Sequence, residues 1–489
     1  MPQLDKTNTL IPYKFSKNNG VIVSEIKNTI QVKSLKNTSL EVISELSIFF
    51  NKPLSISWID KQDFERALSS LYDDTAESSS DLIEGIDEEY DLNSLVEGLP
   101  KTSDLQNDND DAPVIKLINA VLSEAIKSNA SDVHIEPYEE YISIRFRIDG
   151  ILKEILKPNS RLSSMLNARI KVMSNLDIAE KRIPQDGRMS LKLGEKWIDI
   201  RVSTLPSSHG ERVVLRILDK ADTQIGLKQL GINNRSLDKL ERILKNPNGI
   251  ILVTGPTGSG KTTTLYAALN ILNDQSRNIL TVEDPIEYAV DGVGQTQVNN
   301  KIGMTFAKGL RAILRQDPDI VMVGEIRDLE TAEIAVQASL TGHLVLSTIH
   351  TNDAVSALTR LKDMGIEPYL LSSTLKGVLA QRLVRKLCNE CKVKITTKEN
   401  TLDFITGSEV YESLGCSFCN KTGYSGRIGI FELLLVDDVI KDHITQGTSE
   451  SELKKLAFSD MPVLSSSGKE LVLKGITSID EILRVTREQ

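Results

Sequence analysis

A glycine-rich segment that follows an apolar run carries the clearest chemistry in this sequence. The run Ile250–Val253 leads into Gly255-x4-Gly260-Lys261-Thr262, the spacing of a phosphate-binding loop. Glycines allow backbone N–H groups to approach a polyphosphate, and the helix expected next adds its positive dipole end. Lys261 can reach the β- and γ-phosphates, and the Thr262 hydroxyl can bind Mg²⁺. The residues expected to hold ATP and Mg²⁺ are Gly255, Pro256, Thr257, Gly258, Ser259, Gly260, Lys261, Thr262 and Thr263.

A single acidic side chain ends a later apolar run, Ile320–Val323. Asp319 precedes this run and Glu325 follows it, which resembles the second nucleotide motif of phosphate-loop proteins, an apolar strand ending in an acid. Gly324 stands where an Asp is usual, so Glu325 is the carboxylate that remains at this strand end. Such a Glu could polarise the attacking water or hold Mg²⁺ through a water molecule.

Two further acids end another apolar run. Glu283 and Asp284 follow Ile279–Val282 and stand ahead of Pro285. Their carboxylates could complete the Mg²⁺ shell that a missing second-motif Asp leaves short. A solvated loop would carry the same residues, so the sequence leaves both interpretations open.

Two histidines, His343 and His350, flank a further apolar run. A neutral imidazole could sense the γ-phosphate and relay its state, whereas a lone His is often structural. The residues alone do not decide between these roles. Apolar runs without polar alternation predict strands covered on both faces, hence a parallel sheet flanked by helices. Ligands of such sheets gather at the carboxyl ends of the strands.

All four cysteines of the chain fall into two Cys-x2-Cys pairs. They are Cys388, Cys391, Cys416 and Cys419. Four thiolates at this spacing predict a tetrahedral Zn²⁺ site. Because the cysteines complete the ligand set, the site is expected to be closed and structural, in a module at about 386–428.

The bulk composition sets limits on the function. The 489 residues are enough for about three domains. The net charge of −10 comes largely from residues 73–111, which hold 14 Asp and Glu and one Lys, and the rest of the chain is near neutral. A strongly basic nucleic-acid binder is therefore excluded. No apolar run reaches the roughly 18 residues of a membrane span, so we expect a cytoplasmic protein without a direct span.

The expected fold class is α/β with several parts. The predicted boundaries are an N-terminal α/β domain at 1–72, an acidic linker at 73–112, an α/β domain with a mainly antiparallel sheet at 113–220, a link at 221–235 and a phosphate-loop (RecA-like) parallel-sheet domain with the zinc module at 236–489. The strand prediction in the second domain is clearest at Ile142–Ile148, where apolar and polar residues alternate.

Four segments together resemble the secretion ATPase superfamily. They are 255–264, 281–288, 310–328 and 341–352, which correspond in that superfamily to the Walker A, Asp-box, atypical Walker B and His-box segments. The resemblance runs from about residue 92 to the C-terminus. Residues 95–100 ahead of 111–119 are most similar to the type II secretion ATPases, the E components. The zinc module is shared with pilus-extension ATPases but is typically missing from retraction ATPases, and the chain length fits the secretion branch better.

The resemblance implies particular roles for site residues. In that superfamily Glu325 is the catalytic carboxylate, and both His343 and His350 lie near the phosphates. The ring is a homo-hexamer whose second domain supplies arginines to the nucleotide, and the candidates by position are Arg201 and Arg216. Salt bridges on the sheet face are the alternative for each arginine, and other arginines are less favoured competitors: Arg145, Arg147 and Arg188.

The resemblance also implies partners and a place in the cell. Residues 1–72 would dock on the cytoplasmic part of an inner-membrane L-type secretion component, and the ring would act on an inner-membrane platform protein. The expected function is an ATPase of the translocase class that powers pseudopilus assembly and protein export, peripheral at the inner membrane through its partners. A pilus-extension ATPase and a nucleotide-gated assembly scaffold are the alternatives. DNA translocation is disfavoured by the near-neutral charge.

Overall fold

The computed structural model describes most of the chain from residue 19 onward. The described residues are 19–26, 29–35, 38–50, 54–60, 64, 111–193, 196–218, 226–274, 276–397 and 408–486. Their contacts divide the chain into two units, residues 1–148 with 152–217 and residues 149–151 with 218–489. The acidic segment 73–110 lies outside the described residues. In the described part of the chain, every helix is too short or too polar to cross a bilayer.

The first unit contains a small three-stranded sheet. Its elements are β1 (Val21–Ile26), β2 (Thr29–Leu35), α2 (Leu40–Phe50) and β3 (Leu54–Ile59). β1 pairs with β2 antiparallel, and β2 pairs with β3 parallel, with α2 as the crossover between them. Alternate strand residues, among them Val23 and Val32, form a core against Leu46. The mixed strand and helix signals of this region therefore describe a real α/β element.

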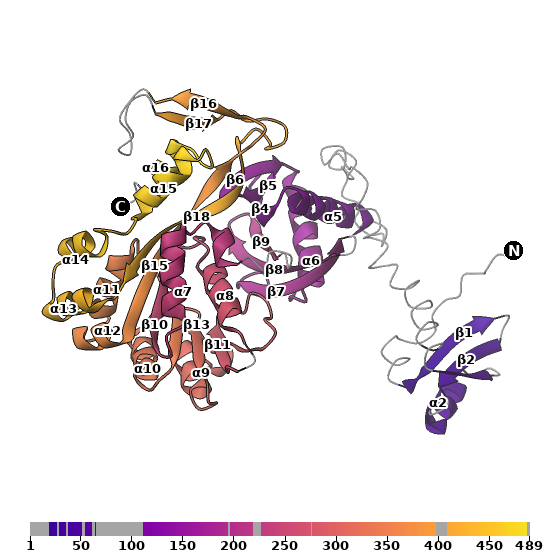
Figure 1. Ribbon diagram of the computed structural model, residues 1–489. Helices are drawn as coiled ribbons and strands as arrows, with labels where there is room; N and C mark the ends of the chain where they lie inside the picture. The colour runs from indigo at the N-terminus through magenta and orange to yellow at the C-terminus, as the bar shows by residue number, and fades with distance from the viewer. Residues whose placement is uncertain are drawn as a thin grey trace. The chain divides into compact units, whose positions relative to one another are not determined.

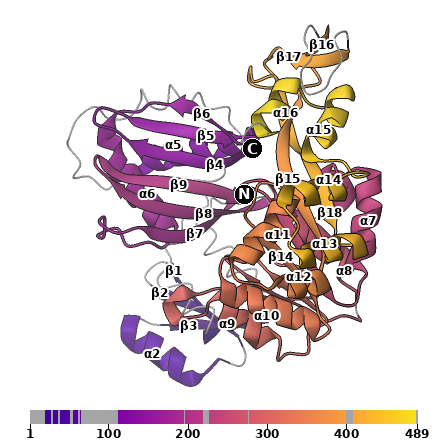
Figure 2. The same ribbon diagram turned by 90° about the vertical axis from the view of Figure 1, so that its left-hand side faces the viewer.

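A six-stranded sheet follows in the same unit, in the order β6-β5-β4-β9-β8-β7. The strands are β4 (Ala130–Pro137), β5 (Ile142–Ile148), β6 (Ile151–Leu156), β7 (Gln185–Leu193), β8 (Lys196–Ser207) and β9 (Gly210–Leu218). β4 pairs antiparallel with β5 and β9, as does β7 with β8. Helices α5 (Asp111–Lys127) and α6 (Ser163–Met173) share one core with this sheet (Figure 2). The antiparallel-sheet prediction is confirmed.

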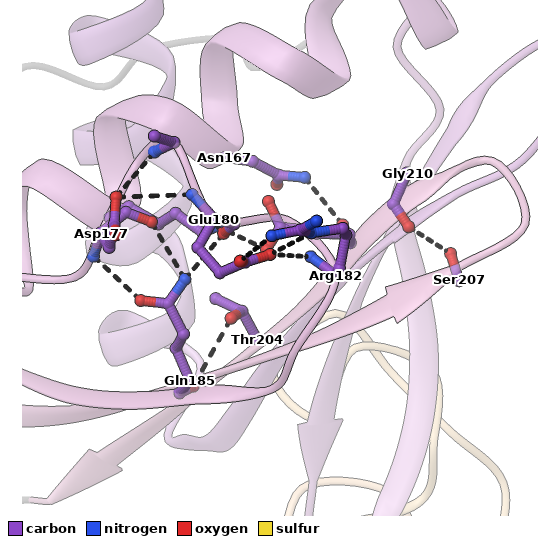
Figure 3. A network of polar contacts seen from close by, with 11 residues as sticks. Asn167, Asp177, Glu180, Arg182, Gln185, Thr204, Ser207 and Gly210 are labelled. Atoms are coloured by element: carbon purple, nitrogen blue, oxygen red, sulfur yellow. Dashed lines mark hydrogen bonds and ion pairs between the residues drawn. The ribbon is translucent and has the colours of Figure 1, made fainter.

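A buried ion pair ties α6 to the loop that leads into β7. The Lys171 side chain is 1% exposed, lies 2.5 Å from Glu211 and donates to the carbonyl oxygen of Glu180 at 2.7 Å. Gln185 donates to the same carbonyl and to that of Asp177 (Figure 3). These bonds satisfy the charge and the backbone groups that folding removes from water, and they fix the path of the loop.

The second unit is built on a seven-stranded sheet, in the order β12-β11-β13-β14-β10-β15-β18. The strands are β10 (Gly249–Thr254), β11 (Ile279–Glu283), β12 (Val293–Gln297), β13 (Ile320–Val323), β14 (Leu344–Ile349), β15 (Leu375–Leu387) and β18 (Tyr424–Leu435). All neighbours pair parallel except β15 and β18, which pair antiparallel. The predicted parallel sheet is confirmed.

Helices cover both faces of this sheet (Figure 1). They are α7 (Asn234–Leu244), α8 (Lys261–Leu272), α9 (Phe306–Ile313), α10 (Leu329–Leu340), α11 (Ala354–Asp363) and α12 (Pro368–Thr374). Alternate residues of β10 enter two different cores: Ile250 and Leu252 pack with α9 to α12, and Ile251 and Val253 pack with α7 and α8. Burial of both faces explains why these strands read as continuous apolar runs.

The C-terminal part adds a small sheet and four helices. They are β16 (Lys392–Thr396), β17 (Glu409–Ser413), α13 (Asp438–Gln446), α14 (Glu450–Ala457), α15 (Leu464–Leu473) and α16 (Ile479–Thr486). Glu481 on α16 has a side chain only 1% exposed, and its carboxylate accepts hydrogen bonds from Arg385 at 2.8 Å and from Arg484 at 2.7 Å. Burial would raise the pKa of Glu481, but the bonds from Arg484 and Arg385 hold it at about 2.

Glu481→Gln is expected to destabilise the second unit by about 3–5 kcal/mol at pH 7, because it leaves the largely buried Arg385 guanidinium without its anion. The low pKa adds stability above pH 4.5, the ordinary value of this carboxyl, and that stability is lost as pH falls from 4.5 towards 2. The difference between wild type and variant in urea unfolding should therefore shrink over that range. Glu470→Gln, at an exposed pair with Lys474, is the control and should cost less than about 1 kcal/mol. A difference that does not change with pH would contradict the ion-pair account.

Candidate functional site

The phosphate-binding loop connects β10 to α8 at the carboxyl edge of the sheet. Gly255 and Gly260 adopt φ values of +148° and +85°, which only glycine takes without strain. Helix α8 begins at Lys261, and no described side chain caps its first turn. Its first N–H groups are therefore available to an anion. The backbone has the form that the spacing predicts for a phosphate loop.

The side chain of Lys261 is folded back onto this loop. Its Nζ donates to the carbonyl oxygens of Gly255 at 2.8 Å and Pro256 at 3.0 Å, and the residue is 9% exposed. Burial lowers the pKa of Lys261 to about 8, against the opposing effect of the Glu325 charge. An ammonium has three donors, so one remains beyond the two that hold the loop. The loop thus contains a buried cation that a phosphate would stabilise.

Glu325 lies at the same edge, two residues beyond the end of β13. Its carboxylate forms an ion pair with the Arg327 guanidinium and lies 3.4 Å from Nε2 of His350. The side chain is 13% exposed, so the carboxylate is nearly buried but still meets solvent. Burial and the positive charge of Lys261 lower the pKa of His350, which keeps the imidazole neutral near pH 7. The structure therefore brings Lys261, Glu325 and His350 together.

Glu283 lies beneath this edge rather than on it. The residue is 3% exposed, and its carboxylate accepts hydrogen bonds from Tyr266, from Thr281 at 2.6 Å and from Gln295 at 3.1 Å. Both oxygens are engaged, which does not favour the predicted role as a Mg²⁺ ligand. Asp284, the next residue, is exposed and close enough to raise the pKa of Arg327.

His343 lies at the opposite edge of the sheet. It precedes β14, and its Nδ1 lies 2.9 Å from the carbonyl oxygen of Ala338 and 3.2 Å from Oγ1 of Thr341. His350 follows the same six-residue strand, so the two histidines stand about 20 Å apart at roughly 3.3 Å per residue. Of the two, the structure brings only His350 to the phosphate loop of its own chain.

The two candidate arginines belong to the first unit. Arg216 donates from Nε to Asp132 at 2.9 Å while its side chain stays 60% exposed. Burial raises the pKa of Asp132, but hydrogen bonds from Arg216 and Ser131 and the charges of Arg216 and Arg147 lower it overall. Arg201 on β8 stands opposite Arg188 on β7. The salt-bridge interpretation thus applies to Arg216, whose exposed guanidinium keeps donors for a further anion.

The competing arginines Arg145 and Arg147 also form ion pairs on this sheet. Arg145 binds Glu136, which Arg212 contacts as well, and Arg147 lies 3.7 Å from Asp132. Within the described residues these side chains serve the sheet itself.

Two residues at the edge were not predicted from the sequence. Arg327 could have been found, because it stands two positions after Glu325 and so has the spacing of a neighbour on one side. Gln381 had no sequence signal: it lies more than a hundred residues from the phosphate loop, and pairing of β15 with β10 brings it there.

The four cysteines meet at one point. Their sulfur atoms all lie within 4.8 Å of one another, and the separations include 3.9 Å for Cys388 and Cys416, 3.8 Å for Cys391 and Cys419, and 3.7 Å for Cys416 and Cys419. Zn–S bonds of about 2.3 Å in a tetrahedron place sulfurs about 3.8 Å apart. The N–H of Gly423 also donates to the Cys419 sulfur at 3.1 Å, which favours a thiolate. The donor set fits Zn²⁺.

Two family models match the chain. Residues 107–484 match the model of the type II/IV secretion system protein, and residues 10–72 match that of the N-terminal domain of GSPII protein E. A relative from Aeromonas hydrophila, type II secretion system protein E, is 52% identical over 98% of this chain and 96% of its own. The type II secretion system ATPase E of Vibrio cholerae is 51% identical over 98% and 97%.

Solved structures share the fold. The pilus retraction motor PilT with bound ADP has a TM-score of 0.54 and 28% identity, over 76% of this chain and 97% of its own. The ATPase DotB of Legionella pneumophila has a TM-score of 0.57 at 22% identity, over 76% and 95%. With a family model across 107–484 and relatives at half identity over nearly the whole length, the chain belongs to the type II/IV secretion system protein family and is a type II secretion ATPase.

Proposed function

We propose that the chain hydrolyses ATP at the carboxyl edge of its parallel sheet and uses the energy for pseudopilus assembly and protein export by a type II secretion system. The observation that carries this proposal is the meeting of a buried lysine, an uncapped helix start and a nearly buried carboxylate at one edge. The Vibrio cholerae relative is named an ATPase of such a system, which supports the same function here.

Each residue at the edge has a role in this proposal. Lys261 exchanges its bonds to the Gly255 and Pro256 carbonyls for bonds to the β- and γ-phosphates, and the N–H groups at the start of α8 bind the same oxygens. Thr262 would hold Mg²⁺, which neutralises phosphate charge when it is bound. Glu325 orients the attacking water and accepts its proton.

Arg327 and His350 hold Glu325 from two sides. A guanidinium beside the carboxylate keeps it ionised, and the neutral imidazole lies where it can sense the phosphate state. Glu283 is proposed to act indirectly, through its network with Tyr266, by fixing the end of β11. We retain no phosphate contact for His343 within its own chain.

The finer parts of the function concern the assembly. We propose a homo-hexamer in which Arg201 and Arg216 neutralise charge on the transferring phosphoryl group, which suits the planar guanidinium fork. The predicted domain boundaries are retained, with residues 1–72 docking on the cytoplasmic part of an L-type inner-membrane component. The match of residues 10–72 to a family model of their own supports a separate first domain. The protein would then act in the cytoplasm at the inner membrane, on a platform protein.

Glu325→Gln is expected to keep nucleotide affinity within about threefold and to lower turnover at least a hundredfold, because the amide cannot accept the proton of water. Phosphate release and fluorescent-nucleotide binding by the full chain would measure both. Glu333→Gln, at an exposed position on α10, is the matched control and should leave turnover unchanged. Turnover of the wild-type rate in Glu325→Gln would disprove the assignment, and no hydrolysis by wild type under any condition would favour the scaffold alternative.

The cysteine module should contain about one zinc per chain, bound by four thiolates. Cys391→Ser is expected to remove most of the metal and to lower the melting temperature, because metal binding supplies folding free energy. Elemental analysis of the purified full chain and thermal unfolding provide the measurements, with Ser417→Ala in the same loop as control. Metal-free wild-type protein of equal stability would contradict the site.

Removal of residues 1–72 should abolish stimulation of hydrolysis by the cytoplasmic part of an L-type partner while basal turnover persists, because the phosphate loop lies in a different unit. Hydrolysis rates of 1–489 and 73–489, each with and without the partner fragment, make the comparison. Equal stimulation of both chains would overturn the docking role of 1–72. Clear basal hydrolysis without any partner response would favour pilus extension.

A further inference from the structure

Strand β15 passes directly behind the phosphate loop. It pairs parallel with β10, and Ala380 stands opposite Thr254, the last residue of β10 (Figure 1). Gln381 therefore comes level with the start of the loop. It is a polar residue that is only 1% exposed, so its amide must find partners inside the protein.

The Gln381 side chain is bonded to helix α8. The hydroxyl of Thr264, which is 2% exposed, donates to Oε1 of Gln381 at 2.6 Å. Because the amide is planar, this bond also fixes the position of Nε2. The hydrogen bond joins two residues 117 positions apart and anchors the first turn of α8 to β15.

The same residue sets the space that the loop occupies. A Cβ atom at Gly260 would lie 2.9 Å from Nε2 of Gln381, and one at Gly255 would collide with the Gln381 carbonyl oxygen. Both glycines of the phosphate motif therefore lie against Gln381, and their lack of a side chain is needed on this side of the loop as well as on the phosphate side. The loop rests on Gln381 from behind.

The next residue of β15 contacts the other loop of the site. Arg382 donates from Nη2 to the carbonyl oxygen of Asn352 at 3.2 Å and to its Oδ1 at 3.3 Å. Successive side chains of a strand point to opposite faces, so Gln381 meets the phosphate loop while Arg382 meets the loop after His350. One strand thus positions both loops that carry the edge.

We propose that Gln381 is a positioning residue for nucleotide binding: through Thr264 and the two motif glycines it holds the phosphate loop in the shape that receives the phosphates, without touching the nucleotide. This inference rests on the proposed function, in which the nucleotide binds that loop. A loop that is held in its bound shape loses less conformational freedom on binding, so affinity is gained by preorganisation.

The direct test removes the hydrogen bond and keeps the volume. Gln381→Met in the full chain is expected to raise the Kd of a fluorescent ADP analogue about five- to tenfold, the value of one buried neutral hydrogen bond. Thr264→Val should have a similar effect. If the two residues act as one unit, Gln381→Met combined with Thr264→Val will bind no more weakly than either single variant. The KM for ATP should rise, while kcat at saturation changes less than about twofold.

A matched control separates positioning from a general loss of stability. Thr374 is another buried hydroxyl in the same unit, just ahead of the other end of β15, and it donates to the carbonyl of Leu370 at 2.6 Å. Thr374→Val should lower the melting temperature as Thr264→Val does, yet leave the Kd for ADP unchanged. The inference is overturned if Gln381→Met binds ADP like wild type, if Thr374→Val weakens binding equally, or if the Gln381 and Thr264 effects add. Failure of wild type to bind nucleotide would instead overturn the proposed function, and this inference with it.

Discussion

Parallel pairing of β10 with β14 and β15 is the constraint on which the site depends. Because these strands run in one direction, Thr254 stands level with Ile349 and Ala380, and the residues that form the site gather at one edge. β13 pairs with β14 in the same sense and ends there too. The phosphate loop, Glu325 and His350 meet because their strands end together, and a shift in register would separate them.

Charge at this edge is balanced within the protein. Lys261 is held by two carbonyl oxygens of its own loop, while Glu325 is held by Arg327 and faces His350. A buried ammonium with a lowered pKa is stabilised by an incoming anion, so phosphate binding restores the interaction that burial removed. The carboxylate stays nearly buried but in reach of solvent, which is what activation of water requires.

The sequence predicted those parts of the site whose chemistry is local. The phosphate loop and the Cys-x2-Cys pairs depend on short spacings, and the apolar runs correctly indicated a parallel sheet. The positions of His343 and Glu283 could not be predicted in the same way. A strand of six residues separates its two flanking histidines along its whole length, and the sequence does not say which end meets the phosphates. Glu283 is buried by Tyr266 and Gln295, whose approach depends on packing.

The central claim is that the carboxyl edge is where ATP binds and reacts. The most direct measurement is a structure of the full chain with Mg²⁺ and a non-hydrolysable ATP analogue. The account predicts the phosphates within the loop at 255–262, the Lys261 ammonium moved from the Gly255 and Pro256 carbonyls to the phosphate oxygens, and Glu325 within hydrogen-bonding distance of a water facing the γ-phosphate. A nucleotide bound elsewhere, or a Lys261 that keeps both carbonyl bonds with the analogue present, would contradict it.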